Sequence, residues 1–323
     1  GRGIMAKREN FRFLSSDGRT MIHGVRWIPD SGKYEAVFQI VHGMVEYIER
    51  YEAFAEYLTE QGFLVVGHDH LGHGDSVVSE DDWGYMAGDH GGWCMVRDIH
   101  RVRTVTQRQN KGMPYVILGH SMGSYLLRRY LTRYGRDLSG AVIMGCGYVP
   151  AWKARLAMGL IGGAAAWKGW HFRCPLMERA VFSGAFRNFN LDGTVPGDSW
   201  LTRDVSVVKA YYENPKCTFH FTLSGFYALM ETVYYDGKDD YAAGIPKDLP
   251  IVLVSGDRDP VGDFGKGVRA VERQLRKAGV RDVTVKLYRD SKHEVLNEVN
   301  KECVYRDIGE WARRAAFGER QRP

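Results

Sequence analysis

The chain has 323 residues, 44% of them hydrophobic and 26% charged, and 44 basic residues against 39 acidic ones give a net charge of +5. This composition is ordinary for a globular protein with a full hydrophobic core, and it argues against a disordered chain. The basic residues are spread along the sequence, so we expect no nucleic-acid partner.

The five cysteines are odd in number, widely spaced and without a CxxC pair. They indicate neither a disulfide framework nor a cysteine zinc site, and a reducing compartment is the simplest inference. The polar stretch 1–10 lacks the apolar core of a signal peptide, and the longest apolar run, 157–167, is too short to span a bilayer. We therefore expect a cytoplasmic location.

The first half of the chain alternates between strand-like and helix-like segments. Phe11 and Phe13, the turn at Asp17 and Gly18, and the run 21–27 indicate an antiparallel hairpin. Further strands are expected at 37–41, 63–66, 115–118 and 141–144, and helices at 51–58, 94–105 and 125–134. This alternation predicts an α/β fold, a doubly wound and mostly parallel sheet with helices on both faces.

The alternation stops between residues 150 and 246, a stretch that we call the middle segment. This segment is irregular and aromatic. The α/β alternation resumes after it, with a strand at 251–254, a helix at 267–278, a strand at 283–288 and a final helix at 298–316. We therefore predict a core from 1–149 and 247–323, and an inserted cap or lid, 150–246, over the carboxyl ends of the strands.

A candidate nucleophile lies in "GHSMGS", residues 119–124, where Ser121 stands in a GxSxG pattern between a strand and a helix. In such a nucleophile elbow the serine backbone is strained, and the flanking Gly119 and Gly123 let the strand and helix approach closely. The alternative is a glycine-rich turn with an incidental serine.

A serine hydroxyl needs a general base and a group that orients this base, and in elbow enzymes the acid and the histidine follow the serine in that order. "KHEVLNE" after the strand 283–288 offers His293 as the base. "SGDRDPVG" offers Asp257 and Asp259, with Asp263 close behind. We favour Asp259 because Gly256 opens the turn and Pro260 stiffens it.

The third requirement is an oxyanion hole, a pair of backbone N–H groups aimed at the developing negative charge. One donor should be Met122, directly after the nucleophile. The other should be Met44, because in "IVHGMVEY" a strand ends at Val41 and Gly43 lets the backbone turn. His42 is expected to support this loop.

Five motifs, "HGMVEYIERY", "DHLGHGDS", "GHSMGS", "SGDRDPVG" and "KHEVLNE", resemble in this order the monoacylglycerol lipase and lysophospholipase branch of the α/β-hydrolase superfamily, a group of serine aminopeptidase-type hydrolases. The resemblance implies an eight-stranded, mostly parallel sheet with a lid. It also implies a catalytic triad of Ser121, Asp259 and His293, with Met44 and Met122 as oxyanion donors. Tyr47 stands where the family's HGxxEH has its second histidine, which puts the entrance of the acyl site in doubt.

Two segments allow rival interpretations. "HDHLGH" places His68, His70 and His73 in an HxHxxH pattern close to that of zinc-dependent hydrolases, although the same residues suit a loop. The stretch 151–172 mixes tryptophans with basic residues. It is either an element that dips into a micelle or membrane surface, or a helix packed over the active site.

The sequence thus predicts a serine hydrolase that cleaves carboxylic esters of fatty acyl chains through an acyl-enzyme, without a cofactor or metal. Its partner would be a small acyl ester or lipid, with transient contact at a membrane or micelle surface through the middle segment. The alternatives are a short-chain carboxylesterase, an amidase or peptidase, and a non-catalytic ligand-binding homologue. The absence of the HGGPG motif of proline-releasing peptidases weakens the peptidase alternative.

Overall fold

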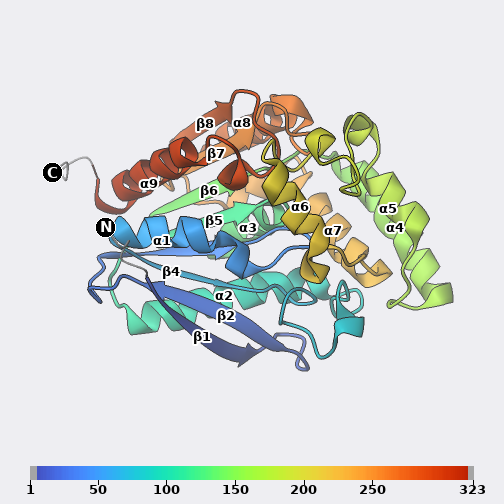
Figure 1. Cartoon of the computed structure of the whole chain (residues 1–323), viewed down its shortest axis with the longest axis horizontal. Coiled ribbons are helices and arrows are strands. Elements are labelled where there is room, and N and C mark those ends of the chain that lie inside the picture. Colours follow the sequence, from blue (N-terminus) through green and yellow to red (C-terminus); the bar gives the residue numbers. More distant parts are fainter. Residues whose placement is uncertain (1–5, 319–323) are drawn as a thin grey trace.

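The computed structural model describes residues 6–318, so half of the polar stretch 1–10 lies outside the described residues. Eight strands form one sheet in the order β1-β2-β4-β3-β5-β6-β7-β8 (Figure 1). β1 pairs antiparallel with β2, and β2 with β4, whereas all other neighbours are parallel. The strands are β1 (Lys7–Leu14), β2 (Met21–Ile28), β3 (Ala36–Val41), β4 (Phe63–His68), β5 (Tyr115–His120), β6 (Gly140–Met144), β7 (Ile251–Gly256) and β8 (Val283–Tyr288).

Helices cover both faces of this sheet, which confirms the predicted α/β architecture. Successive strand residues point to opposite faces. In β3, Phe38 and Ile40 join a core with α1 and α9, while Val37 and Val41 join a second core with α2, α3 and α8. The helices are α1 (Glu52–Glu60), α2 (Gly91–Gln109), α3 (Met122–Tyr134), α4 (Ala151–Lys168), α5 (Pro175–Val181), α6 (Val205–Glu213), α7 (Leu223–Asp236), α8 (Lys266–Lys277) and α9 (Lys301–Phe317).

The expected N-terminal hairpin and all expected strands are present, and the differences concern element ends. β4 continues to His68, and α2 is longer at both ends than expected. The final helix was expected from residue 298 but begins at Lys301. Glu298 has an extended backbone, and its carboxylate accepts hydrogen bonds from the amides of Arg203 and Lys292, so it cannot serve as the first helical residue.

Helices α4 to α7 all lie between β6 and β7, within the middle segment, and α4 packs along α7 (Figure 1). This segment contacts two loops that follow strands of the sheet. The Tyr211 hydroxyl donates to the Val45 carbonyl after β3 at 3.0 Å, and the His293 amide after β8 donates to the Trp200 carbonyl at 3.3 Å.

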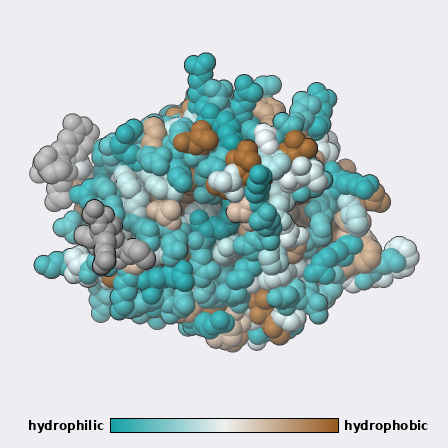
Figure 2. Space-filling model, in the orientation of Figure 1, coloured by the Kyte–Doolittle hydropathy of each residue, from teal (hydrophilic) through white to brown (hydrophobic). Residues whose placement is uncertain are grey.

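The face of the molecule seen in Figure 2 is mainly hydrophilic, with hydrophobic residues in small separate groups. Within residues 6–318, the helices are all too short or too polar to cross a membrane.

Candidate active site

The residues singled out as catalytic all follow parallel strands. Met44 comes after β3, Ser121 after β5, Asp259 after β7 and His293 after β8. Because the carboxyl ends of parallel strands meet at one edge of a sheet, four loops far apart in the sequence emerge there together.

Ser121 lies on a sharp turn between β5 and α3. Its backbone has φ 56° and ψ −119°, a conformation that non-glycine residues rarely adopt and that marks local strain. A Cβ atom on Gly123 would collide with the carbonyl oxygens of Val41 and His42, and one on Gly119 would collide with the carbonyl of Gly123. The two glycines of GxSxG are therefore required by close backbone approach, and the Ser121 side chain is left half-buried.

His293 and Asp259 form a buried pair. The His293 Nδ1 atom lies 2.8 Å from Asp259 Oδ2, and the exposed fractions of the two residues are 2% and 0%. Asp259 Oδ1 accepts from the amide of Val261 at 2.9 Å, which fixes the carboxylate in the loop. Asp257 instead accepts from the amide of Asp290 at 2.8 Å, and Asp263 is exposed. The carboxylate on the histidine is thus that of Asp259.

Residues 144–145, at the end of β6, lie next to both Ser121 and His293. The Ser121 amide donates to the Met144 carbonyl at 2.9 Å, and a Cβ atom on Gly145 would lie 3.2 Å from His293 Cε1. Among residues 6–318, no hydrogen bond joins the Ser121 hydroxyl to the His293 ring. In hydrolases such bonds often tighten only when substrate is bound.

The loop after β3 passes directly beside Ser121. A Cβ atom on Gly43 would lie 3.0 Å from Ser121 Cβ, so only glycine fits at this point. Met44 follows in the same loop and is half-buried. Met122 is the first residue of α3, where a backbone N–H has no acceptor within its own helix.

Glu46 holds this loop in place, a role that the sequence analysis missed. Its Oε2 atom accepts from the Gly43 amide at 2.7 Å and from the Tyr51 hydroxyl at 2.9 Å, and it lies 3.3 Å from His120 Nδ1. Burial alone would raise the pKa of Glu46, but the hydrogen bond with His120 and the charge of Arg50 hold it well below its usual range. The available signal was a glutamate three residues after the loop glycine.

Arg50 extends this network to the histidine loop. It donates to Glu46 at 2.9 Å and to both carboxylate oxygens of Glu294 at 2.7 and 2.8 Å. His120 makes a second link, because its Nε2 atom lies 3.2 Å from the His293 carbonyl. Burial opposes a charge on His120, but the Glu46 carboxylate raises the pKa of the imidazole. The loops after β3 and β8 are therefore joined by charged hydrogen bonds.

His42 supports the loop after β3 as expected. Its Nδ1 atom lies 2.7 Å from the Gly43 carbonyl, and its Nε2 atom accepts from the His70 amide at 2.9 Å.

Trp200, from the middle segment, covers His293. The two rings stack at a centroid distance of 4.8 Å and an interplanar angle of 28°. Phe182 and Phe186 pack against Trp200 in turn. This contact was not predicted, because nothing local in the sequence indicates which tryptophan of the aromatic middle segment meets the histidine.

The histidines of "HDHLGH" do not converge on one point. His70 Nε2 lies 2.9 Å from the His42 carbonyl, and His73 Nδ1 lies 3.2 Å from the Leu71 carbonyl. Within residues 6–318, the group of side chains whose ligand atoms are close enough for a metal ion does not include His68, His70 or His73. The geometry therefore gives no support to a zinc centre at this motif.

The fold and these residues define an α/β hydrolase. A family model described as "Serine aminopeptidase, S33" matches residues 32–300, and the chain belongs to this family.

The chain is 25% identical over 308 residues to a monoacylglycerol lipase of Mycolicibacterium smegmatis, with 95% of this chain and 98% of the relative covered. It is 24% identical to human monoglyceride lipase over 301 residues, covering 92% and 88%. Among solved structures, a carboxyl esterase of Bacillus coagulans is 28% identical with a TM-score of 0.85, covering 95% of this chain and 98% of the esterase. These relatives place the chain among hydrolases of the ester-hydrolase type.

Tyr47, which stands in place of the second histidine of HGxxEH, contacts the middle segment. Asn214 donates to the Tyr47 hydroxyl at 2.9 Å, and the Lys216 ammonium lies 5.3 Å from the centre of the Tyr47 ring.

Proposed function

We propose that this protein hydrolyses carboxylic esters of a single fatty acyl chain, such as monoacylglycerols or lysophospholipids, through an acyl-enzyme. The observation that carries the proposal is the buried hydrogen bond between His293 and Asp259, beside a serine in a strained strand-to-helix turn. An imidazole oriented by a carboxylate next to a serine is the arrangement that turns a hydroxyl into a nucleophile.

In the proposed reaction, Ser121 Oγ attacks the acyl carbonyl while His293 Nε2 accepts the hydroxyl proton. Asp259 accepts from Nδ1–H and stabilises the imidazolium. The amides of Met44 and Met122 stabilise the oxyanion, a contribution of about 3 kcal/mol for one such donor. His293 then protonates the departing alcohol, and a water molecule deprotonated by the same imidazole releases the fatty acid.

The substrate class rests on the relatives and on the residues over the site. The relatives of Mycolicibacterium smegmatis and of humans are named for monoacylglycerols or monoglycerides. In this chain Phe182 and Phe186 pack on Trp200, which stacks on His293. The second candidate is a short-chain carboxylesterase. It is favoured by the 28% identity with the Bacillus coagulans carboxyl esterase.

The middle segment, 150–246, would act as the cap over this site. Three contacts support this part of the proposal: Trp200 on His293, Tyr211 on the Val45 carbonyl, and Asn214 on Tyr47. A cap built this way would select substrates by the shape and polarity of the residues that it presents to the acyl chain.

Helix α4 would bring the protein to a lipid surface, and the location would then be cytoplasmic and peripheral at a membrane. Four of its large apolar side chains, at 152, 156, 160 and 167, lie on one side of the helix and are highly exposed: Trp152 66%, Leu156 61%, Leu160 65% and Trp167 81%. The opposite side is buried against α7. Exposed tryptophan and leucine beside lysine are typical of helices at membrane interfaces.

A substrate panel with Ser121→Ala as the blank tests this function. Purified protein would be assayed on p-nitrophenyl esters, monoacylglycerols and lysophospholipids of increasing acyl length. We expect a preference for long-chain monoesters, and a loss in kcat on the order of 10⁶ in Ser121→Ala, the size seen when comparable triads lose the serine. Circular dichroism would check that the variant is folded.

Two outcomes would contradict parts of the proposal. Residual activity in Ser121→Ala close to that of the parent would refute the nucleophile. A preference for acetyl esters would contradict the lipid substrate and would favour the short-chain carboxylesterase.

A further inference from the structure

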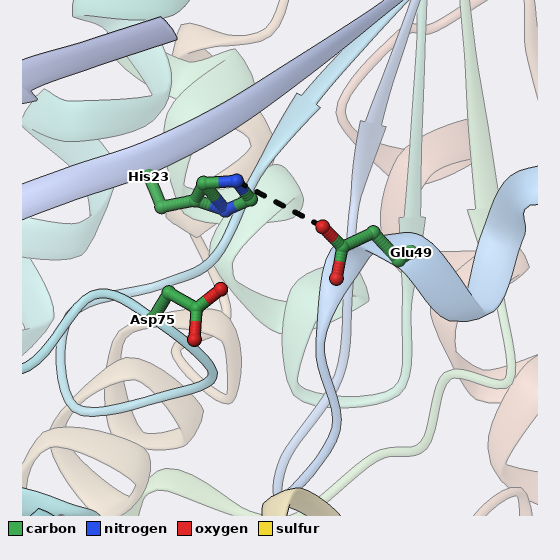
Figure 3. A group of neighbouring side chains, drawn as sticks. All are labelled: His23, Glu49 and Asp75. Carbon is green, nitrogen blue, oxygen red and sulfur yellow. Dashed lines mark ion pairs between the residues drawn. The ribbon is translucent and has the colours of Figure 1, made fainter. Parts of the chain in front are cut away.

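Three side chains that the proposed reaction does not use converge at one point beside β2. They are His23 on β2, Glu49 in the 3-10 turn Ile48–Tyr51, and Asp75 in the loop after β4 (Figure 3). One ligand atom from each lies within 4.8 Å of the others. They are 26 residues or more apart from one another along the chain, so the fold, and not local sequence, brings them together.

His23 presents a nitrogen lone pair to this point. The residue is only 4% exposed, and its Nδ1 atom lies 3.2 Å from Asp69 Oδ2. In the tautomer with the ring proton on Nδ1, this nitrogen donates to Asp69 Oδ2, which also accepts from the Asp75 amide, and Nε2 keeps its lone pair for a ligand. The recorded contact of Nε2 is Glu49 Oε1 at 3.8 Å, too long for a hydrogen bond, and within residues 6–318 Nε2 has no hydrogen-bond partner.

Asp69 positions all three segments. Its Oδ2 atom faces His23 Nδ1 and accepts from the Asp75 amide at 2.9 Å, while its Oδ1 atom accepts from the amide of Ile48, the residue before Glu49, at 2.8 Å. Asp69 is itself fully buried. In zinc sites a metal-binding histidine is usually oriented by a carboxylate that accepts a hydrogen bond from its other ring nitrogen.

The ligand chemistry suits a divalent transition metal. Zinc binds neutral imidazole and carboxylate at about 2.0 to 2.2 Å, so ligand atoms around a tetrahedral ion lie about 3.4 Å apart. His23 Nε2 lies 3.8 Å from Glu49 Oε1, and the three ligand atoms lie within 4.8 Å of one another, so side-chain movements of about 1 Å would bring them to this spacing. Burial lowers the pKa of His23, against the charges of Asp75 and Glu49, which favours the neutral imidazole that a metal requires.

A cation of the protein competes for this position. The Lys216 ammonium, from the middle segment, lies 2.9 Å from Asp75 Oδ1. The Asp75 side chain is 42% exposed, so an ion from solvent can reach it. A metal ion would take Asp75 from Lys216 or share it, and a variant without this ammonium should bind the metal more tightly.

From these contacts we propose that His23, Glu49 and Asp75 form a binding site for one divalent metal ion, with zinc as the best-suited metal and solvent completing the coordination. The site is independent of the proposed catalytic residues.

Isothermal titration calorimetry of the full chain with zinc chloride, after removal of metal with a chelator, tests the site. We expect one ion per chain and a rise in the thermal unfolding midpoint with zinc concentration. Asp75→Asn and Glu49→Gln should each weaken binding at least about tenfold, since even the loss of a residue that only hydrogen-bonds to a ligand costs about 10- to 100-fold in metal affinity. Lys216→Met should strengthen binding about thirtyfold, the effect of removing one positive charge about 4 Å from a divalent ion in a solvated site.

Asp81→Asn is the matched control, because Asp81, in the 3-10 turn Glu80–Asp82, is an exposed acid outside the cluster. It should bind zinc as the parent does, and ester hydrolysis by all these variants should confirm that they are folded. Absence of binding at 1 mM zinc, about the weakest site that titration resolves, would overturn the proposal. Equal affinity in Asp75→Asn, Glu49→Gln and the parent would also overturn it, and loss of binding in His293→Gln would then locate the ion at the catalytic histidine.

Discussion

Asp257 and Asp259 lie two residues apart in one loop, yet their surroundings differ. Asp259 is fully buried and bonded to the His293 ring, whereas Asp257 is half-buried and holds the Asp290 amide. A carboxylate that accepts from the imidazole sets its tautomer, while one that accepts from an amide only shapes the loop. The two positions therefore offer a matched pair for mutation.

Asp259→Asn is expected to lower kcat by about 10⁴, because an amide in this place favours the wrong tautomer of His293. Asp257→Asn should lower kcat by less than about tenfold, through loop movement alone. Steady-state kinetics on one p-nitrophenyl ester, with both variants measured side by side, checks the difference. A larger loss in Asp257→Asn would reverse the assignment of the acid.

At the scale of the element, α4 has two sides of opposite character. Ala154, Ile161 and Ala165 are buried, with 1%, 0% and 6% of their surface exposed, and α4 packs along α7. From sequence, the alternatives for this stretch were an element that dips into a lipid surface and a helix packed over the active site. The helix combines a packed side with an exposed apolar side, because these positions recur with the helical period on opposite faces.

Replacing Leu156 and Leu160 together by serine should weaken binding to phospholipid vesicles by at least about tenfold, since each buried leucine contributes on the order of 1.5 kcal/mol or more. Hydrolysis of a water-soluble acetyl ester should stay unchanged, because neither side chain touches the proposed triad. Co-sedimentation with vesicles measures the binding. Leu14→Ser, at a leucine of β1 that is 56% exposed, is the control and should bind as the parent does. Equal binding by all three proteins would exclude α4 as the contact surface.

On the scale of the whole molecule, the protein buries an unusual set of imidazoles next to the loop after β3. Burial lowers the pKa of His70 to about 4 and that of His73 to about 3, from the ordinary value of 6.5. Two buried carboxyls have the opposite effect on the pH dependence of stability. Burial raises the pKa of Asp69 and of Asp236 to about 7, so the folded state takes up these protons before the unfolded state does. The pH dependence of the free energy of unfolding therefore combines opposing contributions. Comparing a histidine variant with its parent isolates the contribution of that one histidine.

A histidine that stays neutral in the folded chain contributes stability that is present above pH 6.5 and is lost as the pH falls toward its folded pKa, because the unfolded state takes up the proton first. In His73→Gln this contribution is absent. We expect the free energy of unfolding of the parent to fall more steeply than that of the variant between pH 6.5 and 4.5, by about 1.4 kcal/mol per pH unit. Urea unfolding at a series of pH values measures both slopes. Equal slopes would show that His73 takes up its proton at the same pH in the folded and the unfolded chain, which contradicts the prediction.

The order of elements and the loops that carry chemistry were predictable from sequence. Strand and helix periods, and the glycines that interrupt them, are local signals, and β8 was expected at the residues where it lies. The same signals predicted the turn at Ser121, because a GxSxG pattern between a strand and a helix specifies close backbone approach at Gly119 and Gly123. Element ends were less accurate, as at α9, where a long-range contact of Glu298 delays the helix.

What only the tertiary structure decided is which side chains face each other across loops that are distant in the sequence. The contact between Glu46 and the Gly43 amide, the stacking of Trp200 on His293, and the convergence of Glu49 and Asp75 on His23 depend on how strands pair and how the middle segment folds back. Sequence by itself determined the fold class and the candidate nucleophile and base. The positions of the surrounding groups depend on packing between distant segments, for which one sequence contains no local signal.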